Sequence, residues 1–202
     1  VSGARIVVKS PQEFGDGEIR VIEAQVRRGS EADTRNLMEN LPNACYLGGV
    51  FIRGCMVGAG AIKRLGVHLS TVAHCSRFPD LKGFSAEIGH FCVDLSHRGR
   101  GLAKRLVESL LESCRNTLCA TTKEDNQAMQ QILEQSGFKP VGKPWASAQS
   151  PGKKICLWIE PWKLLYLLKW GRAYDGARKR CPWFVARRLS SQEIRGSLTP
   201  GR

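Results

Sequence analysis

The chain has 202 residues and a formal net charge of +13, with 42% hydrophobic and 24% charged residues. This composition is typical of one globular domain plus an extension, and it excludes a wholly disordered chain. No run approaches about 18 uncharged apolar residues, so we expect no transmembrane helix. The N-terminal residues also lack the basic-then-apolar order of a signal peptide.

The eight cysteines include no C-x-x-C pair, and most of them lie inside apolar runs. Such a distribution predicts buried free thiols in a reducing compartment rather than disulfides or a zinc site. We therefore expect a cytoplasmic protein.

Positive charge is concentrated at the C-terminal end of the chain. Residues 161–202 hold ten Lys and Arg against Asp175 and Glu193, a net charge of +8, whereas the first 160 residues hold 21 basic and 16 acidic side chains, a net charge of +5. We predict a domain over residues 1–160 and a basic, aromatic-containing extension over 161–202. The extension either steers an anionic partner such as nucleic acid or serves only as a solvated tail.

Hydrophobic patterning predicts an α/β domain. In chain order we expect a strand at 4–10, helices at 17–29 and 31–41, a hairpin of strands 44–54 and 55–65 with its turn at Arg53-Gly54, a long loop at 66–84 and a strand at 86–95. A helix over 102–114, a strand at 117–122, a helix capped by Asp125 and ending at Gly137, and strands at 138–142 and 154–160 follow.

The helix over 102–114 has the clearest pattern, because its apolar residues recur on one face opposite charged ones. A turn with the sequence Arg98-Gly99-Arg100-Gly101 precedes it. A helix N-terminus exposes unpaired backbone N–H groups, glycines let a ligand approach the backbone closely, and arginines add charged donors. The turn therefore predicts a phosphate site, or else a tight structural turn with incidental arginines.

Two segments resemble the motifs of the GCN5-related N-acetyltransferase (GNAT) superfamily. Arg98-Gly99-Arg100-Gly101-Leu102-Ala103 matches the acetyl-CoA loop [QR]-x-x-G-x-[GA], and "NQAMQQILEQSGF" (126–138) is similar to N-x-x-A-x-x-L-Y-E-K-x-G-F. The similarity covers roughly residues 4–160, and the order of expected elements agrees with the family's. It implies a mixed, mostly antiparallel central sheet flanked by helices.

The resemblance also implies which residues bind acetyl-CoA. Backbone groups of Phe91, Cys92 and Val93 would pair with the pantetheine amides like an added strand. The N–H groups from Arg98 to Ala103 would hold the pyrophosphate. The Asn126 side chain would contact the pantetheine arm, or else cap its helix locally. Leu133 stands where the family often has a tyrosine that protonates the departing thiolate. Either another group protonates the thiolate, or water does, or the domain does not catalyse a reaction.

An acetyl transfer to an amine needs a base. Glu87 matches a position where many family members carry a catalytic or substrate-contacting carboxylate, although it also fits a solvent-facing strand charge. His90 is a second candidate because its ordinary pKa lies near neutrality. Cys92, in an apolar strand, is more readily explained as core.

The acceptor is the least readable part of the sequence. The segment 66–84, where the family usually builds its acceptor site, has few acids, which argues against polycationic amines. The spacing of His68, His74 and Cys75 suits no zinc pattern, so we expect no metal. The stretch beginning at Trp162 is strongly apolar, and we expect it to pack on the domain, to form a homodimer contact or to lie on a membrane surface.

Two functions follow from these features. The first is an acetyl-CoA-dependent N-acetyltransferase that moves an acetyl group to a primary amine by direct attack. The second is a non-catalytic GNAT-like module that binds acyl-CoA and uses its basic tail, with Trp183 and Phe184 between arginines, to bind nucleic acid or protein. The intact acetyl-CoA loop together with Glu87 favours the enzyme.

Overall fold

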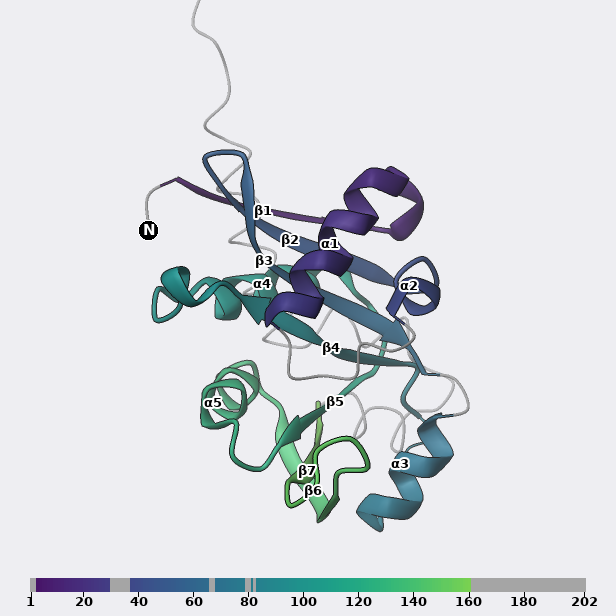
Figure 1. Ribbon diagram of the computed structural model, residues 1–202. Coiled ribbons are helices and arrows are strands. Elements are labelled where there is room, and N and C mark those ends of the chain that lie inside the picture. The colour runs from purple at the N-terminus through teal and green to yellow at the C-terminus, as the bar shows by residue number, and fades with distance from the viewer. Residues whose placement is uncertain (1–2, 30–36, 66–67, 79–80, 82, 161–202) are drawn as a thin grey trace, which may run out of the picture. The chain divides into compact units, whose positions relative to one another are not determined.

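The structure, a computed structural model, describes residues 3–29, 37–65, 68–78, 81 and 83–160 (Figure 1). The predicted boundary at residue 160 falls at the end of these residues, and the predicted extension over 161–202 lies outside them, as does most of the helix expected at 31–41. Within the described part of the chain, strands form one sheet in the order β1-β2-β3-β4-β5-β7-β6.

The strands are β1 (Ala4–Lys9), β2 (Tyr46–Ile52), β3 (Cys55–Arg64), β4 (Ala86–Val93), β5 (Leu118–Lys123), β6 (Lys139–Ala146) and β7 (Lys154–Ile159). Neighbouring strands pair antiparallel except β4 and β5, which pair parallel. The helices are α1 (Asp16–Gly29), α2 (Leu37–Asn40), α3 (His68–Ser76), α4 (Leu102–Ser113) and α5 (Gln127–Gln135), with short 3-10 turns at Pro11–Glu13 and Leu95–His97. The mixed, mostly antiparallel sheet flanked by helices confirms the predicted fold class.

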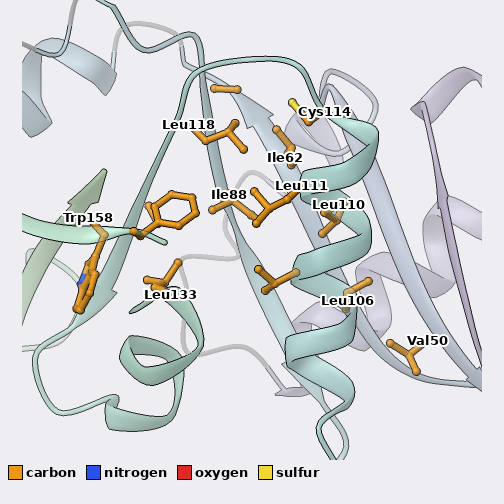
Figure 2. Packing of buried hydrophobic residues seen from close by; sticks show 14 of the residues in the cluster. Val50, Ile62, Ile88, Leu106, Leu110, Leu111, Cys114, Leu118, Leu133 and Trp158 are labelled. Atoms are coloured by element: carbon orange, nitrogen blue, oxygen red, sulfur yellow. The ribbon is translucent and has the colours of Figure 1, made fainter. Parts of the chain in front are cut away.

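Helices cover both faces of the sheet. The apolar stripe of α4 packs with α5 residues against one face, in a cluster that includes Leu106, Leu110, Ile88 and Leu133 (Figure 2). The apolar side of α1 packs on the other face, in a second cluster with α2. The apolar residues that recur along the 102–114 segment are therefore the ones that α4 buries against the sheet.

Glycines in β2 and β3 let α4 lie close to the sheet. A Cβ at Gly48 would lie 2.7 Å from Leu106 Cδ1, and one at Gly60 would lie 2.5 Å from the Phe91 ring. A larger residue at either position would have to displace the core side chain that it meets.

The prediction of a loop over 66–84 was wrong for residues 68–76, which form α3. Polar residues alternate with a few apolar ones here, so the segment carries only a weak helical pattern. Its burial comes from tertiary contact: Val72 and Ser76, one turn apart, are buried, and α3 packs against β6. Packing rather than local pattern stabilises this helix.

Smaller differences concern element ends. Asn126, not Asp125, is the N-cap of α5. β6 runs on to Ala146 because an irregularity between Val141 and Trp145 lets pairing with β7 resume. The hairpin turn at Arg53-Gly54 is confirmed, with both residues at positive φ. The described cysteines are free thiols: Cys45, Cys55, Cys75, Cys92, Cys114, Cys119 and Cys156.

Candidate functional site

The pairing of β4 with β5 ends half-way along both strands. The parallel register joins Ala86 to Leu118, Glu87 to Cys119 and Ile88 to Ala120, and no later pair is formed in the described residues. Yet β4 continues to Val93 and β5 to Lys123, where β5 still pairs with β7. Figure 1 shows the two strands diverging from this point. Among the residues that the structure describes, one edge of β4 therefore has no neighbouring strand beyond Ile88.

A β-bulge lies in β4 where this separation begins. Between the pairs Ala61–Gly89 and Ala59–Cys92, β3 has one residue and β4 has two, His90 and Phe91. His90 takes up the extra residue with a φ of 57°, and its side chain is buried. Bulges of this kind re-aim the residues that follow.

Backbone groups after the bulge face the unpaired edge. The Asp94 N–H donates to the C=O of Val57 in β3, at 2.9 Å. Because successive residues of a strand direct their backbone groups to opposite sides, those of Val93 and Phe91 point away from β3 and towards the missing neighbour. The open edge of β4 therefore carries the backbone groups of Phe91 and Val93, whereas the backbone of Cys92 is turned to β3; their pairing with pantetheine stays a prediction.

The end of β4 is tied to the elements on either side of it. Arg98 Nε donates to the Val93 C=O at 2.9 Å, which anchors the following turn to the strand. The buried Gln25 of α1 donates to Asp94 Oδ1 at 2.6 Å. The Arg98 side chain thus has a structural partner inside the protein.

The turn leads into the N-terminus of α4 with both glycines in the left-handed region. Gly99 has φ 73° and Gly101 has φ 72°, and no heavy atom of the described residues lies within 4 Å of a Cβ built at either. Gly101 is the N-cap and offers no side chain to cap the helix. The first intrahelical bond runs from the Arg105 N–H to the Gly101 C=O, so the N–H groups at 102–104 have no acceptor within the helix. Within the described residues, open space, N–H groups without an acceptor in the helix and the positive end of the helix dipole lie together at this turn, which is the arrangement that binds an anion.

Asn126 follows β5 at the same end of the sheet, because the carboxyl ends of parallel strands meet at one edge. Its Oδ1 accepts the Met129 N–H at 3.1 Å, so the local capping role expected as an alternative is present. The amide Nδ2 is a separate donor, and the cap does not use it.

Glu87 is buried at the last paired part of β4, with 5% of its surface exposed. Its Oε1 accepts the Thr121 hydroxyl at 2.6 Å, and its Oε2 lies 3.0 Å from Lys63 Nζ. The alternative of a solvent-facing strand charge was therefore wrong. Lys63 and Thr121 were missed by the sequence analysis, because only the β3–β4–β5 register places them beside Glu87.

Two further candidate positions belong to the core. Burial raises the pKa of the Cys92 thiol to about 11, and its Sγ donates to the Ala59 C=O at 3.8 Å. A thiol so held is a poor nucleophile. Leu133 is fully buried near Trp158 (Figure 2), so the family's tyrosine position is filled by packing. Among the described residues, no group of three or more His, Cys, Asp or Glu side chains is arranged to hold a metal ion.

Comparison with known proteins identifies the fold and the family. The sequence profile described as "Acetyltransferase (GNAT) family" matches residues 18–138. The chain belongs to this family. It matches no curated protein. The GNAT motifs at 98–103 and 126–138 thus lie in the matched region or at its end.

Solved structures share the fold at low sequence identity. An acetyltransferase described as "IAA acetyltransferase" from Bacillus cereus has a TM-score of 0.52 at 9% identity, with 77% of this chain and 97% of that one covered. The ribosomal-protein-S18-alanine N-acetyltransferase from Escherichia coli has a TM-score of 0.52 at 12% identity, covering 76% and 92%. Arabidopsis thaliana NAA60, solved with a bisubstrate analogue, has a TM-score of 0.54 at 14% identity, covering 77% and 97%.

Proposed function

We propose that the protein is an acetyl-CoA-dependent N-acetyltransferase that transfers the acetyl group to a primary amine by direct attack. The observation that carries the proposal is the separation of β4 from β5 beside the open glycine turn of α4. Family membership supports a transferase over a module that only binds acyl-CoA.

Acetyl-CoA would enter with its pantetheine arm beside the unpaired edge of β4. The backbone groups of Phe91 and the N–H of Val93 would take the place of strand partners for the pantetheine amides, because the Val93 C=O already accepts from Arg98. The Asn126 amide would donate from the β5 side. The N–H groups at the start of α4, with Gly99 and Gly101 leaving room, would hold the pyrophosphate. These donors are preorganised, so little ordering opposes binding.

Glu87 is the proposed base for the attacking amine. Its carboxylate is fixed by Thr121 and Lys63 at the point where the strands begin to separate, which is where the thioester would end. A fixed carboxylate can accept the amine's proton directly or through one water. His90, which lies in the bulge of the same strand, is the alternative base.

Binding of acetyl-CoA tests the proposal without knowledge of the acceptor. A ligand that binds only the folded state raises the melting temperature as its concentration increases. We expect such a rise with acetyl-CoA for the intact chain. Gly101→Glu should remove it, because the carboxylate would occupy the space of the pyrophosphate and repel it.

Gly152→Glu is the matched control. Gly152 has φ 76°, close to that of Gly101, and a Cβ there also meets no described heavy atom within 4 Å. Both substitutions place a side chain in the left-handed region and therefore carry the same backbone strain, but only Gly101 lies at the proposed phosphate site. No rise for the unsubstituted protein at millimolar acetyl-CoA contradicts the proposed function; equal rises for both variants move the phosphate site elsewhere.

A further inference from the structure

The leaving thiolate of the proposed reaction needs a proton donor. Leu133 fills the position that the family resemblance gives to a tyrosine, and it is fully buried. Tyr46 is the only tyrosine among the described residues; it packs with the α4 cluster, which lies on the sheet face opposite α1. Neither residue can supply a proton beside Glu87.

Lys63 lies where the donor is needed. It is directly opposite Glu87 in the β3–β4 register, and its Nζ is 3.0 Å from Glu87 Oε2. The lysine side chain extends over Gly89, because a Cβ built at Gly89 would lie 3.4 Å from Lys63 Cε and 3.6 Å from Nζ. Gly89 is the first residue of β4 after the pairing with β5 ends.

Because Gly89 has no side chain, the Lys63 ammonium group can lie at the point where β4 and β5 begin to separate. The Lys63 side chain is 25% exposed and the Glu87 side chain is 7% exposed, so the cation faces the more open side of the pair. Thr121 holds the other carboxylate oxygen. An acid and a base thus lie side by side, at the place where the thioester would end.

We propose that Lys63 is the general acid that protonates the sulfur of coenzyme A, an inference that rests on the proposed function. The neutral amine attacks the thioester carbonyl and gives a proton to Glu87. The C–S bond then breaks, its electron pair goes to sulfur, and the Lys63 ammonium transfers a proton to that sulfur. The proton on Glu87 crosses to the neutral Lys63 amine, which restores the ion pair.

The ordinary pKa values are consistent with this sequence. A lysine ammonium has a pKa of about 10.4 and a thiol about 8.5, so the transfer from lysine to the thiolate is unfavourable by about two pKa units and needs a favourable step after it. A glutamic acid, with a pKa of about 4.3, readily returns its proton to a neutral lysine. The second transfer drives the first, and no other reactant is required.

The binding part of the test uses coenzyme A as the probe and needs no acceptor, whereas turnover of the variants is measured with whichever amine proves active. An ammonium beside the sulfur favours the thiolate and lowers the pKa of the bound thiol. The affinity for coenzyme A should therefore rise between about pH 6 and about pH 9, tenfold for each unit by which that pKa is lowered. Calorimetric titration with desulfo-coenzyme A, which has no thiol, should show no such rise.

Variants assign the effect to the lysine. Lys63→Met should bind coenzyme A but lose the rise with pH. Lys63→Arg should keep the rise, since the charge remains, while losing turnover, since a guanidinium does not give up its proton. Lys154→Met is the matched control: Lys154 is also a strand lysine paired with a glutamate, Glu124, at 3.7 Å. It should behave as the unsubstituted protein does.

The other titratable groups that lie near Lys63 in the described residues are Glu87 on β4 and Cys119 on β5. They are common to all the variants and to both probes, so the difference between coenzyme A and its desulfo analogue isolates the sulfur. Parallel pH profiles for the two probes in the unsubstituted protein overturn the proposal, as does a rise that persists in Lys63→Met. Failure of both probes to bind instead contradicts the proposed function.

Discussion

Glu87 is a charged residue inside a sheet, and its neighbours explain how it is kept there. A buried carboxylate is costly unless it is paired and hydrogen-bonded. Lys63 and Thr121 supply one partner to each oxygen. The same burial and charge act on Cys119, whose pKa is raised first by burial and then by the nearby Glu87. That thiol stays protonated near neutral pH and is no rival nucleophile.

If Glu87 is the base, Glu87→Gln should lower turnover by about 10²–10⁴. The affinity for acetyl-CoA should stay nearly unchanged, because Glu87 lies away from the proposed phosphate and pantetheine donors. Thiol release measured with whichever amine proves active in a broad panel checks the first expectation, and the acetyl-CoA melting shift checks the second.

Glu124→Gln is the control for this substitution, because it also removes a carboxylate paired with a lysine, in an exposed position. Its turnover should equal that of the unsubstituted protein. Near-normal turnover in Glu87→Gln would transfer the role of base to His90 or to water.

Single residues were predictable from the sequence only where a motif names them. The glycine turn at 98–103 and Asn126 were predicted from motifs, and both lie at the carboxyl end of the parallel strands; their roles in binding stay predictions. Lys63 was not found, because a lysine in a strand has no local signal. Its pairing with Glu87 depends on a register between segments more than twenty residues apart in sequence, which local patterning does not specify.

At the scale of elements, strong periodicity predicted α4 and most strands, whereas contacts between elements decided the rest. α3 is the clearest example, since its helical pattern is weak and its position depends on β6. Gly142 of β6 has φ 69°, and a Cβ there would lie 2.3 Å from the Ser76 carbonyl oxygen at the end of α3. The bulge at His90 is a second example. No residue type in the sequence of β4 indicates a bulge there, and only the pairing of β4 with β3 reveals it.

Gly142→Ala should therefore destabilise the protein more than Gly152→Ala does. Both substitutions place a side chain in the left-handed region, at a cost of about 1–2 kcal/mol. A Cβ at Gly152 meets open space, whereas one at Gly142 collides with the backbone of α3, which should cost about 1–3 kcal/mol more. Free energies of unfolding from urea denaturation measure the difference. Equal values for the two variants would show that α3 is not held against β6 at this point.

At the scale of the whole molecule, the described residues contain no helix that is both long and apolar enough to cross a membrane. The predicted cytoplasmic location stays a prediction, as do the homodimer and nucleic-acid partners expected of residues 161–202. Charge is the property that these residues carry irrespective of their structure: their net charge is +8, from ten basic and two acidic side chains, of the +13 of the chain.

The predicted nucleic-acid partner can be tested by reversing charge in the tail of the full chain. Each phosphate contact by Lys or Arg releases counterions, so binding through the tail should weaken steeply as salt increases. We expect the intact protein to bind single-stranded RNA or DNA at low salt. Reversal to Glu at Arg178, Lys179, Arg180, Arg187 and Arg188 should remove most of this binding and flatten its salt dependence, measured by fluorescence anisotropy across a salt titration.

A control variant with the same change in net charge distinguishes binding by the tail from binding that depends only on the net charge of the whole molecule. Five exposed basic residues of the folded part serve for it when also changed to Glu: Arg20, Arg53, Arg115, Lys139 and Lys143. If the tail is the binding site, this variant should keep most of the affinity, because long-range charge falls off within about 10 Å at moderate salt. Both variants should retain the acetyl-CoA melting shift, which shows that the domain is folded. Equal loss of binding in the two variants would assign polyanion binding to net charge alone, and equal binding by the tail variant and the unsubstituted protein would exclude the tail as a nucleic-acid site.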